Sequence, residues 1–182
     1  MKEWIGYDCS LKLLYRASKS GKNSQKFHFM CDNKGVTLTV FKVGSNFVFG
    51  GFTNVKQHTP NGKYPTFEKD PDAFLFQLFP HKTKHPLIKN PDKAVARSDY
   101  HLACFGKTER EPQEAADLEV WDSPSGAGRG ICNLGNNYYL PESLTYGSVD
   151  AKKYLAGQAS FVINDMEVFQ VKKKTTTAKI SE

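Results

Sequence analysis

The period of the apolar residues changes at Gly35, and this change constrains the fold more than any other feature of the sequence. Before it, Phe27, Met30 and Cys31 recur at three- and four-residue spacing, which is the period of one helix face. After it, residues 36–41 alternate between two sides, which is the period of a strand. The sequence therefore predicts a short helix that is followed directly by strands.

Glycines mark the ends of these expected elements. Gly35 can adopt the left-handed backbone conformation that a helix C-cap favours, so we expect the helix to end there. Gly44 begins a Gly-Ser-Asn turn between two strand-like runs, which predicts a hairpin. Gly50 and Gly51 follow the second run and carry no side chain, so we expect another backbone or a partner to approach closely there.

Strand patterns outnumber helix patterns along the rest of the chain. Residues 73–79 are almost wholly apolar, which is typical of a strand covered on both faces, and residues 117–122 alternate as a half-buried strand does. Residues 161–171 predict a long closing strand. Most of the connections are too short for a crossover helix. We therefore expect an α+β, mainly β, fold: a two-sheet antiparallel β-sandwich with a few short flanking helices.

The length of 182 residues predicts one domain with a sizeable core. We place this domain at residues 1–171 and expect residues 172–182, which begin with three lysines, to form a basic, disordered tail. The start of the chain lacks the apolar run of a signal peptide, and no stretch is apolar for the ~18 residues of a membrane span. We expect no membrane insertion.

The four cysteines lie far apart and form no CxxC pair, which favours a reduced, cytoplasmic compartment. Cys104 lies in an apolar run, so we expect it to be buried, whereas Cys132 borders a glycine-rich stretch and is expected to be more exposed. These two are the candidate redox thiols of an alternative function, a thiol-dependent antioxidant enzyme. Because neither shows a resolving partner in the sequence, we expect packing roles for them.

No complete catalytic or metal-binding pattern is present in the sequence. Neither GxSxG nor GxxxxGK[ST] occurs. His81 and His85 have the i, i+4 spacing of two metal ligands on a helix, but prolines flank them and no third ligand is evident. We therefore expect no cofactor, no metal and no catalytic residue.

The net charge of +6 raises a second alternative, a basic nucleic-acid-binding module. Basic residues interleave with aromatic ones in residues 14–29, where they could follow a phosphate backbone. The charge is nevertheless spread along the chain, and no zinc-finger, helix-turn-helix or RNP-like pattern occurs. We expect a solvated basic face and no nucleic-acid partner.

Several blocks of the sequence together resemble the TLDc domain family. They are LLYRAS at residues 13–18, FH at 27–28, CDNKG at 31–35, FGGFT at 49–53, DPDAFLF at 70–76 and FVINDMEVF at 161–169. Each block alone is only a strand, turn or cap pattern, but together they occur in family order across residues 4–171. The resemblance implies a β-sandwich with flanking helices, in agreement with the fold expected from the residue patterns.

The resemblance also implies which residues are structural or functional positions of the family and what the domain does. The matching positions are Arg16, Asp32, Gly35, Gly50, Gly51 and Glu167. Glu167 matches a carboxylate typical of the family, and we expect it to pair with Arg16 as a structural contact. The implied activity is non-catalytic: binding to a protein partner, the vacuolar-type proton-pumping ATPase, and protection against oxidative stress. Such a domain would be cytoplasmic and would reach organelle membranes only through its partner.

Overall fold

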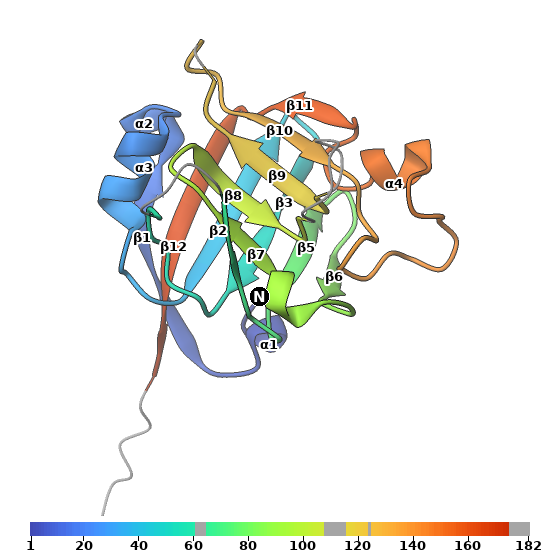
Figure 1. Cartoon of the computed structure of the whole chain (residues 1–182), viewed down its shortest axis with the longest axis horizontal. Helices are drawn as coiled ribbons and strands as arrows, with labels where there is room; N and C mark the ends of the chain where they lie inside the picture. Colours follow the sequence, from blue (N-terminus) through green and yellow to red (C-terminus); the bar gives the residue numbers. More distant parts are fainter. Residues whose placement is uncertain (61–64, 108–115, 124, 175–182) are drawn as a thin grey trace, which may run out of the picture.

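The computed structural model describes residues 1–60, 65–107, 116–123 and 125–174. These residues form two six-stranded antiparallel sheets, shown in Figure 1, so the predicted sandwich is confirmed. In order, the first sheet contains β1 (Cys9–Arg16), β12 (Asp165–Lys173), β2 (Thr37–Val43), β3 (Phe47–Thr53), β5 (Phe74–Phe79) and β6 (Thr83–Pro86). The second contains β11 (Ser160–Val162), β10 (Arg129–Cys132), β9 (Leu118–Trp121), β8 (His101–Phe105), β7 (Val95–Arg97) and β4 (Thr66–Glu68).

The helices are short and lie at the edges of the sheets (Figure 1). They are α1 (Lys2–Ile5), α2 (Ala17–Ser20), α3 (Ser24–Cys31), α4 (Val149–Lys153) and the 3-10 turn η1 (Pro91–Lys93). In the described part of the chain, no helix has the length and apolar character needed to cross a membrane.

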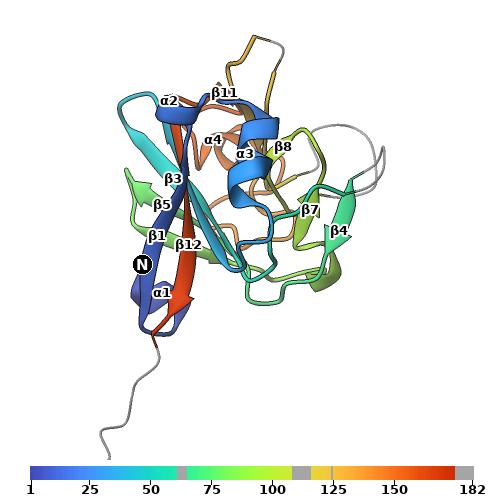
Figure 2. The same cartoon turned by 90° about the vertical axis from the view of Figure 1, so that its left-hand side faces the viewer.

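The first and last strands of the chain, β1 and β12, pair side by side (Figure 2). β12 continues through Lys172 and Lys173, which pair with Ser10 and Cys9, so the closing strand ends two residues after the residue 171 that the sequence predicted for it. A run of lysines has no apolar alternation, but the ladder of hydrogen bonds needs only the backbone. Residues 175–182 of the expected tail lie outside the described residues.

The main core lies between the two sheets and is rich in aromatic rings. Phe41 and Phe49 of the first sheet and Phe105 of the second are each at most 1% exposed. A second cluster covers the outer face of the first sheet, where Trp4 of α1 packs against Phe76. Side chains of the first sheet are therefore buried on its outer face as well as on its inner face.

Helix α3 has the predicted buried face but a different end. Asn23 caps its start, because its side chain accepts a hydrogen bond from the backbone N–H of Lys26 at 3.1 Å. The helix ends at Cys31, and the predicted cap at Gly35 is wrong, although Gly35 is left-handed (φ 81°). Asn33 already turns the chain away (φ 59°), and its N–H donates to the carbonyl of Gln57 at 2.8 Å. A tertiary contact thus ends the helix before the glycine.

The strand predicted at residues 117–122 is buried on both faces rather than half-buried. Leu118 and Val120 face the main core, while Glu119 between them is only 5% exposed. The outer face of this sheet carries its own small cluster, in which Cys104 packs with Ala96 and Ala116. Because this cover comes from distant segments, the alternation of charged and apolar residues did not show it.

Candidate functional site

The surface beside α3 contains an open hollow of about 670 Å³. Its walls come from the helix, from the segment after β3 and from the turn before β8. The lining residues are Ser24, Gln25, His28, Phe29, Asp32, Asn33, Thr59, Asp99 and Tyr100. The hollow therefore joins segments that lie far apart in the sequence.

The floor of this hollow is a fixed polar network centred on Asp32. One carboxylate oxygen of Asp32 lies 2.9 Å from Nδ1 of His28, and the other accepts a hydrogen bond from the hydroxyl of Thr59 at 2.8 Å. Nε2 of His28 lies 3.1 Å from the carbonyl oxygen of Ser98. Because both ring nitrogens are engaged with protein acceptors, His28 serves as a structural bridge and is not poised as a general base.

The rim of the hollow is aromatic. Phe29 is 82% exposed, the largest exposed fraction among the exposed large hydrophobic side chains of the described residues, and Tyr100 is 38% exposed. Helix periodicity directs Phe29 away from the face that buries Phe27 and Cys31. The helix period is the sequence signal that could have identified Phe29, which was not among the candidate residues. Aromatic residues are enriched in protein interfaces, so Phe29 and Tyr100 make this rim a candidate binding surface.

The family positions Arg16 and Glu167 form the predicted pair. They are directly opposite each other in the β1–β12 ladder, and Nη2 of Arg16 lies 2.5 Å from Oε1 of Glu167. Both side chains are about one-third exposed (36% and 29%), so this is a solvent-accessible ion pair that links the first and last strands. Water screens such a pair, which limits its contribution to stability.

The paired glycines allow close packing, as the sequence predicted. A Cβ atom on Gly50 would overlap the carbonyl oxygen of Thr39 on the neighbouring strand. On Gly51 it would overlap the ring of Phe105, which comes from the opposite sheet. Neither glycine has a positive φ, so their role is spatial.

The TLDc domain model matches residues 5–172. The chain belongs to the TLDc domain family. No curated protein matches the sequence.

All four cysteines of this TLDc domain are buried and free. The burial of Cys104 is confirmed, whereas the expected exposure of Cys132 is wrong: its side chain lies in the main core, 2% exposed. Burial raises the pKa of the Cys132 thiol to about 12 and that of Cys104 well above its ordinary value. Thiols held protonated are poor nucleophiles, so this environment gives no support to a redox role for either residue.

The histidines at 81 and 85 do not form the metal-binding pair that was considered. Residues 83–86 form β6, so the i, i+4 spacing does not place the two side chains on one helix face. His85 is fully buried: its Nδ1 lies 2.9 Å from the carbonyl oxygen of Tyr139 and its Nε2 lies 3.0 Å from the Thr83 hydroxyl. Burial lowers the pKa of His85 to about 4.

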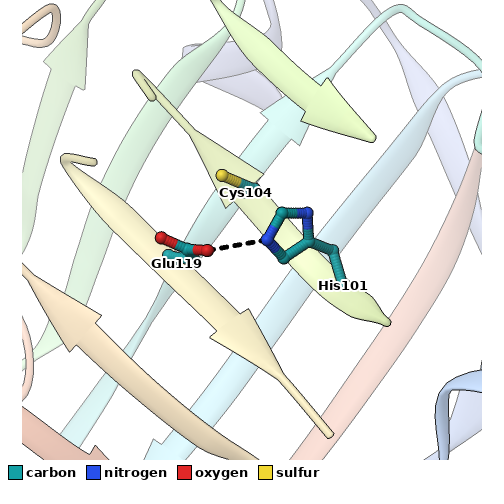
Figure 3. A group of neighbouring side chains, drawn as sticks. All are labelled: His101, Cys104 and Glu119. Carbon is teal, nitrogen blue, oxygen red and sulfur yellow. Dashed lines mark hydrogen bonds and ion pairs between the residues drawn. The ribbon is translucent and has the colours of Figure 1, made fainter. Parts of the chain in front are cut away.

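A different group of side chains, from β8 and β9, could hold a metal ion. His101, Cys104 and Glu119 are all buried, and one potential ligand atom of each lies within 4.8 Å of the others (Figure 3). Nε2 of His101 lies 2.7 Å from Oε1 of Glu119, and the ammonium of Lys107 lies 2.6 Å from the same oxygen. Burial opposes ionisation, but the hydrogen bonds from His101 and Lys107 hold the pKa of Glu119 below its usual value.

The sequence patterns do not reveal this group, because its members are spread over two strands. A bulge in the β8–β9 pairing, between His101 and Ala103, brings His101 and Cys104 to the same face of the sheet. Regular alternation would have put residues three apart on opposite faces. The missing signal is therefore the bulge, which no residue pattern in β8 reveals.

Proposed function

We propose that this TLDc domain is a non-catalytic module that binds a protein partner, the vacuolar-type proton-pumping ATPase, and modulates its assembly or activity. Through that pump it would contribute to resistance to oxidative stress. The domain would act in the cytoplasm and lie at organelle membranes only through the pump. The family relationship supports the general class of this proposal, and the α3 surface supports the binding mode.

The exposed ring of Phe29 is the observation that carries the proposal. A large apolar side chain at 82% exposure gains most by being covered, and Tyr100 beside the same hollow offers a second amphipathic ring. The surface is also preorganised, because Asn23 caps the helix and Asp32 links it to Thr59 of the following loop. Preorganisation lowers the entropic cost of docking.

The long segment at residues 56–69, which contains two prolines, takes part in this surface. Binding residues tend to lie in long loops that a rigid sandwich carries. Thr59 belongs to this loop and lines the hollow, while residues 61–64 lie outside the described residues. A second long segment, residues 107–116, is described only at Lys107 and Ala116.

Binding of the purified chain to the intact, detergent-solubilised pump tests the proposal. The informative variant is Phe29→Ser, which removes the exposed ring without touching the core. Its matched control is Val149→Ser, since Val149 is 63% exposed but lies on α4, away from the hollow. We expect at least about a tenfold loss of affinity for Phe29→Ser, which is about 1.4 kcal/mol or more, and no loss for the control.

Pump activity should follow binding in the same series. The wild-type chain and Val149→Ser are expected to change the rate of ATP hydrolysis equally, and Phe29→Ser to change it much less. If both variants bind and act as wild type does, the docking surface lies elsewhere. If the wild-type chain neither binds nor affects the pump but consumes peroxide through its thiols, the antioxidant alternative replaces the proposal.

A further inference from the structure

The His101, Cys104 and Glu119 side chains supply a nitrogen, a sulfur and an oxygen on one face of the second sheet (Figure 3). This is the mixed, borderline-soft donor set that suits zinc, whereas magnesium and calcium prefer oxygen ligands alone. Their exposed fractions are 3%, 0% and 5%, so the three donors are removed from bulk water. Zinc binds to three protein ligands and a water in many proteins, chiefly in catalytic sites.

One nitrogen of the His101 ring has no polar contact in the described part of the chain, whereas the other faces Glu119 (Figure 3). Nδ1 of His101 is buried and has no hydrogen-bond partner among the described residues. A buried polar atom without a partner costs free energy, and such atoms are rare in folded proteins. The imidazole is therefore not held by a complete network of its own, as a purely structural histidine would be.

The remaining observation is that a cation already occupies this environment. The ammonium of Lys107 lies 2.6 Å from Oε1 of Glu119, the same oxygen that lies 2.7 Å from Nε2 of His101. The site therefore already balances the carboxylate with a positive charge. The Lys107 side chain is 21% exposed, so its ammonium can move out to water when another cation takes its place.

We propose that His101, Cys104 and Glu119 form a zinc site that joins β8 to β9, with Lys107 as the competing cation. Zinc would bind through His101, the thiolate of Cys104 and the carboxylate of Glu119, and the Cys104 proton would be released to solvent. The ammonium of Lys107 would leave the carboxylate at the same time. No redox step is involved. This site goes beyond the proposed pump binding and does not depend on it.

Metal titration of the full chain tests the site directly. The protein is stripped with a chelator and titrated with Zn²⁺ against a chromophoric competitor, and with Co²⁺ to record the thiolate-to-cobalt band in the near ultraviolet. We expect one equivalent of metal and a thiolate band in the wild-type protein. Cys104→Ser and Glu119→Gln should each weaken binding by at least about 100-fold. Cys132→Ala is the matched control, a buried cysteine outside the cluster that should leave binding unchanged.

Lys107→Gln gives a test in the opposite direction. Removing the competing ammonium should tighten zinc binding by about tenfold or more, whereas a site elsewhere on the surface would not respond. If the ligand variants fail to fold, X-ray absorption of the zinc-loaded wild-type protein decides the question. One sulfur at about 2.3 Å with nitrogen and oxygen at about 2.0–2.2 Å supports the site. Absence of a thiolate band in the wild type, or full binding by Cys104→Ser, would overturn it.

Discussion

One carboxylate oxygen of Asp117, just before β9, accepts a hydrogen bond of 2.7 Å from the backbone N–H of Gly135, 18 residues later. The same oxygen accepts from Asn136 at 2.9 Å, and the second oxygen accepts from Asn137 at 2.7 Å. Asp117 is fully buried. A single side chain thus supplies the acceptors for a stretch of backbone after β10 that pairs with no strand there.

Replacing Asp117 with Asn should destabilise the domain strongly. The amide keeps one oxygen but turns an N–H₂ group toward backbone donors, so buried N–H groups lose their acceptors. We expect a loss of about 2–4 kcal/mol in the free energy of unfolding, measured by urea denaturation. Asp92→Asn is the control, because the Asp92 side chain is 74% exposed, and it should change stability by less than about 0.5 kcal/mol. Equal effects of the two changes would refute this role for Asp117.

The sequence could predict the parts of the fold that local patterns encode. The change of period at Gly35 gave the helix and hairpin, and the apolar run at residues 73–79 gave β5. The family resemblance singled out Glu167, and its pairing with Arg16 followed from seeking a cation for a carboxylate within a strand. The helix, the hairpin and β5 were thus predicted from the spacing of their own residues, whereas the ion pair also needed the resemblance.

The remaining features depend on contacts between distant segments. The alternation of residues 117–122 placed Asp117 on the polar face of a half-buried strand. The sequence did not show its buried role, because its hydrogen-bond donors lie in a loop that no strand pattern describes. The network from His28 through Asp32 to Thr59 joins a helix to a later loop. Only the packed chain shows which polar residues are buried together, so the candidate site was less predictable than the fold.

Glycine is needed at some positions of this domain for lack of space and at others for a positive φ, and alanine substitutions should distinguish the two reasons. Gly50→Ala places a methyl group against the Thr39 carbonyl, which cannot move without breaking the sheet, and 2.8 Å from the ring of Phe76. Gly147→Ala meets no atom within 4 Å, but its φ of 80° costs about 1–2 kcal/mol. We expect Gly147→Ala to fold with a modestly lower Tm and Gly50→Ala to lose cooperative unfolding. Similar Tm values for both variants would show that strand β3 tolerates a side chain at position 50.

His85 should make the domain less stable in mild acid. Burial lowers its pKa from 6.5 to about 4, so the unfolded chain takes up a proton at a pH where the folded chain does not. The contribution of neutral His85 to the free energy of unfolding is therefore fully present above pH 6.5 and is lost progressively as the pH falls toward 4. The loss should reach roughly 3 kcal/mol.

Comparison with His85→Asn isolates this effect. The asparagine amide can donate to the Tyr139 carbonyl as Nδ1 does, but it does not titrate. The variant should be less stable than wild type at pH 7, and the difference should shrink as the pH falls. Urea denaturation at several pH values measures the difference. Parallel pH profiles for the two proteins would mean that His85 is not the group responsible.

The reactivity of the cysteines distinguishes a binding module from a thiol enzyme. The four thiols are each at most 2% exposed, and a catalytic thiol must reach its oxidant as a thiolate. We expect a chromogenic disulfide reagent to label the native protein slowly, at a rate set by opening of the fold, and to label all four cysteines at once in denaturant. Labelling at increasing reagent concentration is the check, because a labelling rate limited by opening of the fold becomes independent of the reagent concentration.

A native cysteine that reacts rapidly and in proportion to the reagent concentration would instead be accessible and activated. Mass spectrometry would then identify it, and its replacement by alanine should abolish peroxide consumption if the domain is an antioxidant enzyme.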